Sequence, residues 1–492
     1  MATDAVDEAV KAPRETENIS LFFALVCCLL SLSVVWTTLS DHAVSHWVSG
    51  SMFLIFCLAG LMRFGLREKA LMIIAVIVTV FAVWRLGSDA WPLVLEDLSR
   101  GAYLAAFMML LACLREGAFR SRSVLKIGHY LTNQPPGRRY LALHVGGHFI
   151  GVLLNFSAIS LLGPLILRGA QAAHSPDSPR ALYDIRLRRQ ISALSRGFSW
   201  FNLWAPTAIS QAVVLTTVPG SRASIIAPLG LAIAFIMMWA GWAEDRMTGY
   251  RARMRLARDG FKLSSREAPP FPGTALLRFL AVAAGLLGLA FLIYAVSDIL
   301  FVSAIMIAAL PLTVLWLTVQ TFTDSHRTVR ELRDEVRRLL RFAIPSGSPE
   351  AATLGVAGYI GLLAASIASH SAFAEALALE GFSPAAVYVA VSAFIPLASC
   401  IGLPPIMIVT FIGGILVAMP QLGLNPSMLG LALLVGWALN LTGSPFSATS
   451  LLLSRVVGIP GPVHAWRWNG LFTLMSWVVG ALVLTAAAGW IG

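Results

Sequence analysis

The chain has 492 residues, of which 57% are hydrophobic and only 12% are charged. Soluble globular domains carry about 25% charged residues, so this composition excludes a water-soluble fold and indicates a lipid solvent. The formal net charge of +11 does not indicate a nucleic-acid partner, because the basic residues lie in short loops between apolar segments. That distribution is the one expected of cytoplasmic loops in a membrane protein.

The start of the chain predicts a tail and a first span. Residues 1–19 are polar and are expected to form a cytoplasmic tail, since neither their charge nor the long apolar run after them fits a cleavable signal peptide. Residues 20–46 are expected to hold the first transmembrane helix. The five cysteines all lie in apolar segments without metal-ligand spacing, so we expect buried thiols and no metal site.

Residues 47–243 predict a first unit of membrane helices. Within it, the apolar segment 141–167 is flanked on both sides by strongly basic stretches. Both flanks are expected in the cytoplasm, so the segment must enter the membrane and return as an inner hairpin, turning near Asn155. About 27 residues suffice for two half-helices. Irregular backbone at membrane depth is tolerated only beside protein or a water-filled cavity, so the hairpin predicts a site.

Residues 244–272 are expected to form a basic cytoplasmic loop, and residues 273–492 a second unit. In this unit the segment 384–418 is flanked by stretches without Lys or Arg, and its middle, 399–405, is irregular. We expect an outer hairpin here. The two hairpins open to opposite sides, which predicts two inverted repeats.

Two further segments support the repeat, because each is interrupted by a proline. Gly197 precedes Pro206 by nine residues, and Gly436 precedes Pro445 by nine. The predicted fold class is therefore an all-α polytopic membrane protein, with about 11 transmembrane helices plus two re-entrant hairpins. Inverted repeats with interrupted helices are typical of secondary transporters, whose half-helix ends bind solutes and ions.

Hydroxyl and amide side chains are concentrated at the hairpin tips and helix interruptions. They could contact a solute, or they could cap half-helices and hydrogen-bond one helix to another. The residues expected to bind the solute are Asn155, Ser157, Ser160, Thr207, Ser210, Ser444, Ser447 and Thr449. The residues expected to bind a coupling ion are Asn440, Thr442 and Gly402.

Other polar residues allow more than one interpretation. His144 and His148 lie four residues apart, where packing or a proton relay fits better than a metal site. Asp298 lies between two apolar runs, at the expected outer interface. Arg196 and Arg455 lie near the inner ends of the interrupted spans, where a long side chain snorkels to the interface or serves as a countercharge.

The expected function is secondary transport of a small, anionic solute, and not an enzymatic reaction. Neither hairpin and neither interrupted span contains Asp or Glu, which disfavours the alternative of a sodium/proton antiporter that alternates on a buried carboxylate. That alternative would use Asp298. A membrane-embedded transferase is a weaker alternative. No cofactor is expected, apart from sodium as a coupling ion.

The order of spans and opposed hairpins resembles the ion transporter superfamily, and in topology the divalent anion:sodium symporter family. That family carries a Ser-Asn-Thr signature at each hairpin tip, whereas this chain has Asn155-Phe156-Ser157 and Gly402-Leu403-Pro404. The resemblance implies an elevator mechanism and a homodimer. The expected location is the cell inner membrane, with a cytoplasmic N-terminus, an outer C-terminus and lipids as neighbours.

Overall fold

The computed structural model describes residues 20–119, 121–172, 179–258, 268–323, 329–369 and 381–491. Every regular element in these ranges is helical, and nine described segments are long and apolar enough to cross a membrane. The predicted all-α polytopic membrane fold is therefore confirmed. The predicted tail, 1–19, lies outside the described residues.

The chain forms its helices in two runs. The first run contains α2 (Leu21–Ser40), α3 (Ala43–Gly60), α4 (Leu66–Leu86), η1 (Gly87–Asp89), α5 (Ala90–Phe119), α6 (Arg122–Thr132), α7 (Pro136–Leu154), α8 (Ser157–Gln171), α9 (Arg180–Phe201), α10 (Ile209–Thr217) and α11 (Ala223–Arg258). The second run contains α12 (Gly273–Val296), α13 (Phe301–Thr323), α14 (Val329–Arg338), η2 (Leu339–Ala343), α15 (Ile344–Ser346), α16 (Ser348–Ser369), α18 (Pro384–Ser399), α19 (Pro405–Val417), η3 (Pro420–Leu422), α20 (Pro426–Gly443), α21 (Ala448–Val457), η4 (Val463–Trp468) and α22 (Gly470–Ile491).

Local sequence signals set several helix starts. Asn425 caps α20, because its side-chain oxygen accepts hydrogen bonds from the backbone N–H groups of Ser427 and Met428 at 3.0 and 3.2 Å. Pro426 follows at the first helical position, where its missing N–H costs nothing. Ser383 and Pro384 begin α18 in the same way.

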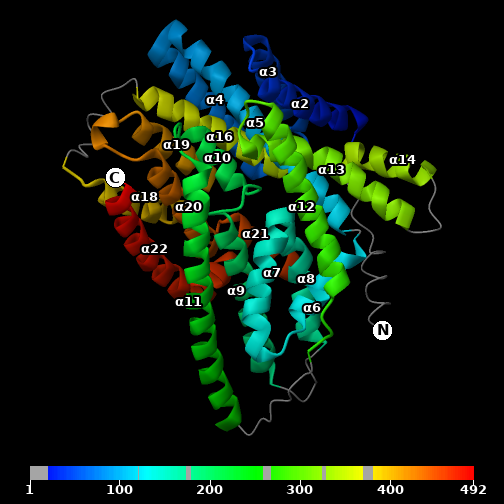
Figure 1. The fold of residues 1–492 in the computed structure, drawn as a ribbon. Helices are drawn as coiled ribbons and strands as arrows, with labels where there is room; N and C mark the ends of the chain where they lie inside the picture. Colours follow the sequence, from blue (N-terminus) through cyan, green and yellow to red (C-terminus); the bar gives the residue numbers. More distant parts are fainter. Residues whose placement is uncertain are drawn as a thin grey trace.

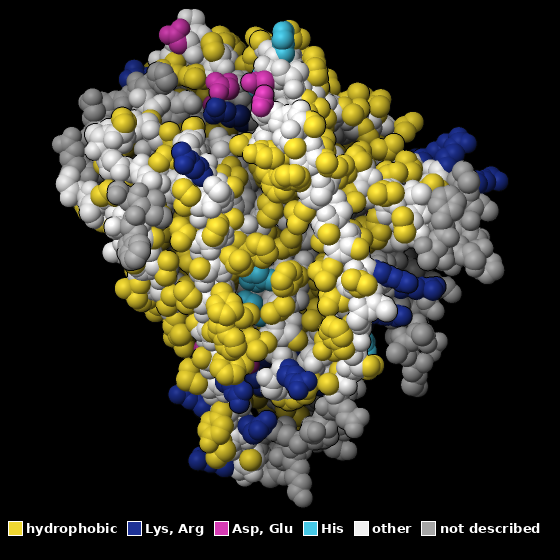
Figure 2. Space-filling view, in the orientation of Figure 1, with side chains coloured by type: hydrophobic (Ala, Val, Ile, Leu, Met, Phe, Trp, Pro, Cys, Tyr) yellow, Lys and Arg dark blue, Asp and Glu magenta, His cyan; other side chains and the backbone are white. Residues whose placement is uncertain are grey.

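Burial separates the centre of the bundle from its lipid-facing rim. In the span that contains α20 and α21, 89% of the most apolar window is buried, against 11% in the span that contains α4. Large apolar side chains on α4, among them Val76, Val80 and Trp84, are more than half exposed. Hydrophobic side chains also cover much of the face in Figure 2, while Lys and Arg lie at its lower end, on its right side and near its top. Only lipid offers such a surface a favourable solvent.

The two predicted hairpins are helix–turn–helix pairs whose arms contact each other, α7 with α8 and α18 with α19. In Figure 1 the α7–α8 pair lies in the lower half of the molecule and the α18–α19 pair in the upper half. Their contacts correspond: α7 packs on α9 as α18 packs on α20, and α8 packs on α21 as α19 packs on α10. Each hairpin therefore touches the interrupted helices of both units. We call α7–α11 and α18–α22 together the hairpin bundle.

The paired glycines of the sequence lie at the matching contacts in these two units. A Cβ atom on Gly197 of α9 would lie 2.1 Å from the carbonyl oxygen of His144 in α7. A Cβ atom on Gly436 of α20 would lie 2.6 Å from the Ile395 side chain of α18. Both distances are below contact range, so a larger residue would separate each interrupted helix from its hairpin arm.

The remaining long helices form a second layer. Helix α16 packs on α4, α5 and α19, while α13 packs on α5 and α12. Helices α2 and α3 pack on each other and on α5. We call α2–α5, α12, α13 and α16 the outer layer.

Two predicted boundaries differ from the structure. Residues 43–46, expected with the first helix, already belong to α3. The helix expected to end near residue 243 continues as α11 to Arg258, so the first part of the predicted loop 244–272 is helical. The continuation has a packing reason, because Glu244 and Asp245 are buried against α9. Residues 259–267 lie outside the described part of the chain.

Cysteine labelling tests whether α7–α8 enters and leaves on one side. Lys126 and Arg180 flank the pair and are exposed, as are Asp298 and Gln421 in connections expected on the outer side. In a background without the five native cysteines, single cysteines at Lys126 and Arg180 should react with an impermeant thiol reagent from the cytoplasm only. Cysteines at Asp298 and Gln421 should react from the opposite side. Labelling of Lys126→Cys and Arg180→Cys from opposite faces would show that the pair crosses the membrane.

Candidate functional site

Asn155 forms the turn at the tip of the α7–α8 hairpin. Its backbone has φ of 51° and ψ of −133°, a positive-φ conformation outside the left-handed helical region that favours glycine. Its amide nitrogen donates to the carbonyl oxygen of Thr207 at 3.5 Å, and the Thr207 hydroxyl donates to the carbonyl oxygen of Val152. The hairpin tip is thus hydrogen-bonded to the α9–α10 interruption, which brings together two residues predicted to share a site.

Side chains within the α9–α10 interruption are hydrogen-bonded to one another and to the nearby backbone. The Ser210 hydroxyl lies 2.9 Å from the carbonyl oxygen of Asn202 and 3.2 Å from its side-chain oxygen. The Asn202 amide nitrogen donates to the carbonyl oxygen of Phe198 at 3.0 Å. Ser210, predicted to contact solute, therefore has its hydroxyl occupied by the fold.

The second interruption, between α20 and α21, is tied to the second hairpin in a comparable way. The Ser444 hydroxyl donates to the carbonyl oxygen of Ser399, the last residue of α18, at 2.9 Å. The Ser450 hydroxyl donates to the carbonyl oxygen of Ser444 at 2.8 Å. Ser447 caps α21 by accepting from the Ser450 backbone N–H at 3.2 Å. In both units, a hydroxyl at the helix interruption thus donates to a carbonyl near the end of the first hairpin arm.

Asn440 and Thr449 differ from the other polar residues at this interruption. Both are fully buried, and among the described residues neither amide atom of Asn440 nor the hydroxyl of Thr449 has a hydrogen-bond partner. Buried polar groups are almost always paired, so these atoms are free to meet a ligand or water. Asn202 at the first interruption, by contrast, uses both ends of its amide.

The other two predicted ion ligands lie in different surroundings. Thr442 donates to the carbonyl oxygen of Leu439 at 3.3 Å and accepts from the Thr473 hydroxyl at 2.9 Å. Gly402 is exposed, has φ of 93° and would leave an added Cβ in open space. The structure therefore leaves unpaired side-chain atoms on Asn440 but not on Thr442.

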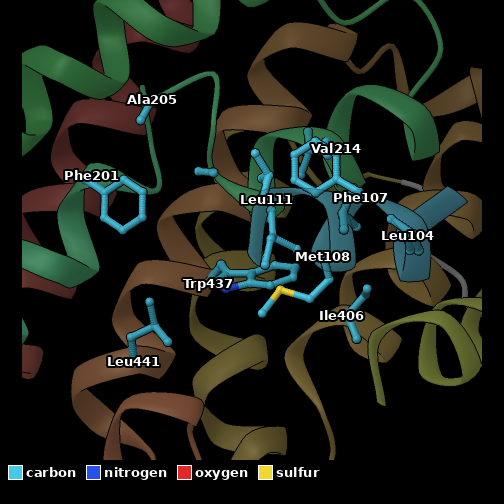
Figure 3. Packing of buried hydrophobic residues seen from close by; sticks show 14 of the residues in the cluster. Leu104, Phe107, Met108, Leu111, Phe201, Ala205, Val214, Ile406, Trp437 and Leu441 are labelled. Carbon is cyan, nitrogen blue, oxygen red and sulfur yellow. The ribbon is translucent and has the colours of Figure 1, made fainter. Parts of the chain in front are cut away.

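A cavity of about 50 Å³ lies at the first hairpin tip. It brings together three predicted solute contacts, Asn155, Ser157 and Ser160. The rest of its lining comes from Met108, Leu111, Ala112, Arg115, Leu154, Phe156, Glu350 and Leu452. Met108 and Leu111 also belong to the buried cluster drawn in Figure 3 with Trp437 of α20, so the cavity borders the core between α5 and the hairpin bundle.

Groups of opposite charge line this cavity. Helix α8 begins at the cavity, and no side chain caps its N-terminus, which carries a partial positive charge. Arg115 adds a guanidinium whose described contact is a hydrogen bond to the Ser346 hydroxyl. The exposed carboxylate of Glu350 lines the same cavity. Together these groups fit a monoanion better than a polyanion.

The structure shows where the residues with more than one predicted role lie. His144 and His148 stack at 5.3 Å between ring centroids, and His148 stacks on Trp204 at 6.0 Å. Asp298 is exposed in the connection between α12 and α13. Arg455 is exposed at the end of α21, as expected of a snorkelling side chain.

The snorkelling interpretation is wrong for Arg196, which is 2% exposed. It pairs instead with Glu244 of α11, with 2.7 Å between Nη1 and Oε2. This partner was missed because the sequence placed Glu244 in a loop. Glu350 and Arg115 were not predicted as site residues either, because each lies at the end of a predicted span, where a charged side chain is ordinary. Their shared cavity arises from contacts between distant helices.

Comparison with solved structures finds a similar fold in a described transporter. No family model and no curated protein matches the sequence. The Alcanivorax borkumensis YdaH transporter matches at a TM-score of 0.55 and 14% identity, covering 87% of this chain and 98% of that chain. At this identity the match shows a shared fold alone.

Neisseria gonorrhoeae MtrF, described as illuminating a class of antimetabolite efflux pumps, matches at a TM-score of 0.47 and 13% identity, covering 86% of this chain and 95% of that one. The YdaH transporter is not described as a divalent anion:sodium symporter, so this match does not support the resemblance to that family.

Proposed function

We propose that the protein is a secondary transporter that carries a small anionic solute across the membrane. The observation that carries the proposal is the cavity at the first hairpin tip, where Asn155, Ser157 and Ser160 meet Arg115. Asn155 also bonds the α9–α10 interruption, so a solute in this cavity would contact a hairpin and neighbour a broken helix at once. The fold shared with the YdaH transporter supports the same conclusion.

The solute class follows from the charges around the cavity. One arginine and one helix N-terminus attract an anion, while Glu350 opposes a second negative charge. A monoanion that also carries a hydrogen-bond donor for Glu350 satisfies all three groups. The apolar Met108, Leu111 and Leu452 in the lining would contact an apolar part of the solute.

For the movement itself we propose an elevator mechanism in a homodimer. The hairpins and interrupted helices of both units interlock, since α8 packs on α21 and α10 packs on α19. This hairpin bundle would slide against the outer layer and expose the cavity to either side of the inner membrane. Sodium is the proposed coupling ion, because Asn440 offers an unpaired oxygen in the last turn of α20, where the helix dipole favours a cation. Thr449, in the first turn of α21, offers a second unpaired oxygen.

A sodium/proton antiporter is the second candidate, and one observation favours it. Asp97 of α5 is 2% exposed, and one of its carboxylate oxygens has no partner among the described residues. A buried carboxylate of this kind is what an antiporter needs. Asp97, and not the exposed Asp298, would carry the exchange.

Uptake into proteoliposomes tests the proposal. A panel of organic monoanions and dianions is offered with and without a sodium gradient, and we expect sodium-stimulated uptake of at least one monoanion. Asn155→Ala and Pro445→Ala should each lower uptake by roughly tenfold or more, with the folded protein still in the membrane. Asn155→Gly is the sharper variant, since glycine keeps the positive φ while the amide is lost.

Two distinct outcomes would contradict the proposal. Wild-type kinetics in both Asn155→Gly and Pro445→Ala would remove these residues from the site. Cation-dependent proton movement without anion uptake, abolished by Asp97→Asn, would establish the antiporter in place of the anion carrier.

A further inference from the structure

Arg196 occupies the centre of a polar junction inside the hairpin bundle. Its guanidinium pairs with Glu244 of α11 at 2.7 Å, and its Nε donates to the side-chain oxygen of Asn469 at 2.9 Å. The guanidinium carbon lies 4.1 Å from the centre of the Phe472 ring of α22, and Tyr140 of α7 is also hydrogen-bonded to it. One residue of the first interrupted helix thus touches α7, α11 and α22.

The junction continues by hydrogen bonds to the second interruption. The Asn469 amide nitrogen donates to the carbonyl oxygen of His464 at 2.9 Å. The His464 Nδ1 lies 2.9 Å from the Ser450 hydroxyl, which contacts the Ser444 carbonyl at 2.8 Å. A connected path therefore runs from α9 to the interruption between α20 and α21.

The path defines the tautomer of His464. A hydroxyl has one proton, and the Ser450 proton is needed for the short contact with the Ser444 carbonyl. His464 must then donate from Nδ1 to Ser450, which leaves Nε2 without a proton; Nε2 has no partner among the described residues.

His464 stays neutral in this setting. Helices α20 and α22, which pack against its segment, carry no charged residue, and the charged residue facing it from α9 is Arg196, itself paired with Glu244. Arg467 lies on its own segment and is exposed. Burial, and then the charge of Arg196, lower the pKa of His464 to about 3. A neutral ring that donates one fixed hydrogen bond from Nδ1 orients Ser450 and takes no part in proton transfer.

We propose that Arg196 is a positioning residue that, through Asn469 and His464, fixes the second helix interruption relative to the first. The proposal rests on the proposed transport function, in which both interruptions belong to one moving bundle. Packing of α8 on α21 and of α10 on α19 joins the two units elsewhere. The Arg196 path is a polar connection between them, and through Asn469 and His464 it links α9 to the serines at the second interruption.

A reporter cysteine tests the path without requiring transport. Phe446 lies in the second interruption, is 49% exposed, and donates its backbone N–H to the Ser444 hydroxyl. In a cysteine-free background, we measure the rate at which Phe446→Cys reacts with a thiol reagent in proteoliposomes. Arg196→Lys keeps the charge opposite Glu244 but loses the fork that reaches Asn469, and Asn469→Ala removes the next link. Each should change the rate by about tenfold, and the double variant should match the single ones.

Matched controls separate this role from general damage. Arg189→Lys alters the neighbouring pair with Asp245, whose bonds are 2.8 and 2.6 Å long, without touching Asn469, so it should leave the reporter unchanged. A second reporter, Ser160→Cys in the first cavity, should also be unaffected. His464→Asn places an amide donor near the former Nδ1 and should keep the wild-type rate, whereas His464→Gln places it near Nε2 and should not.

Three outcomes would overturn the proposal: an unchanged reporter in both Arg196→Lys and Asn469→Ala, additive effects in the double variant, or an equal effect of Arg189→Lys. If Arg196→Lys does not fold, Asn469→Ala and the two His464 variants decide the matter. Absence of solute uptake by the wild-type protein would remove the proposed function but not these reporter rates. In an active protein, Asn469→Ala should lower Vmax of transport more than it raises KM.

Discussion

Arg115→Gln is expected to raise the KM for anion uptake by about ten- to a hundredfold while the protein stays folded. A hydrogen bond to a charged group contributes about 1.5–3 kcal/mol, and each 1.4 kcal/mol corresponds to about a factor of ten. Arg115 lines the cavity at the first hairpin tip and is the one arginine among the described residues of its lining. Uptake kinetics in proteoliposomes measure the change.

Two controls isolate the charge at this position. Lys126→Gln removes an exposed basic residue of α6 that does not line the cavity, and it should leave KM unchanged. Ser346→Ala removes the described hydrogen-bond partner of Arg115 but keeps the guanidinium, and it should have a smaller effect. An unchanged KM in Arg115→Gln would exclude this cavity as the anion site. Glu350→Gln should improve uptake of dianions, because it removes the opposing charge.

Asn440→Leu is expected to stabilise the protein and to abolish sodium-stimulated transport. Both amide atoms of Asn440 are buried without a partner among the described residues. An unsatisfied buried polar group costs about 1–3 kcal/mol, and an apolar residue of similar size avoids that cost. The free energy of unfolding should therefore rise by about that amount in the absence of sodium. Thermal unfolding in detergent, with sodium or choline as the cation, measures it.

Asn202→Leu is the matched control for this prediction. Asn202 lies at the other interruption and uses its amide to bond Phe198 and Ser210, so its loss should lower stability at every sodium concentration. Sodium should protect the wild-type protein against unfolding but not Asn440→Leu. Should Asn440→Leu destabilise the protein as Asn202→Leu does and still transport normally, Asn440 would be a structural residue and not an ion ligand.

The sequence by itself determined that this protein lies in lipid and in what order its helices follow one another. A chain with 57% hydrophobic and only 12% charged residues cannot cover its surface with polar groups, so its composition decides the membrane class. The positions of the turns could also be predicted from short stretches of sequence. Polar Asn155 and Ser157 interrupt an apolar run, and a proline such as Pro206 or Pro445 removes a backbone donor, so each interruption could be predicted from one or two residues.

The tertiary structure decided which polar groups are free and which are used. The sequence predicts Asn155, Ser157 and Ser160 to lie together because they are neighbours in the chain, and the cavity contains all three. It cannot separate Asn440 from Asn202, or Thr449 from Ser210, because hydrogen-bond partners depend on how segments pack.

Arg196 shows the same limit most clearly. Its charge near an apolar span suggests a snorkelling side chain. In the structure it is buried and forms an ion pair with Glu244, which lies on a different helix and 48 residues away in the chain. Pairing between distant charges depends on packing, which no local pattern records. For the same reason, only the folded chain brings Arg115 and Glu350 to one cavity.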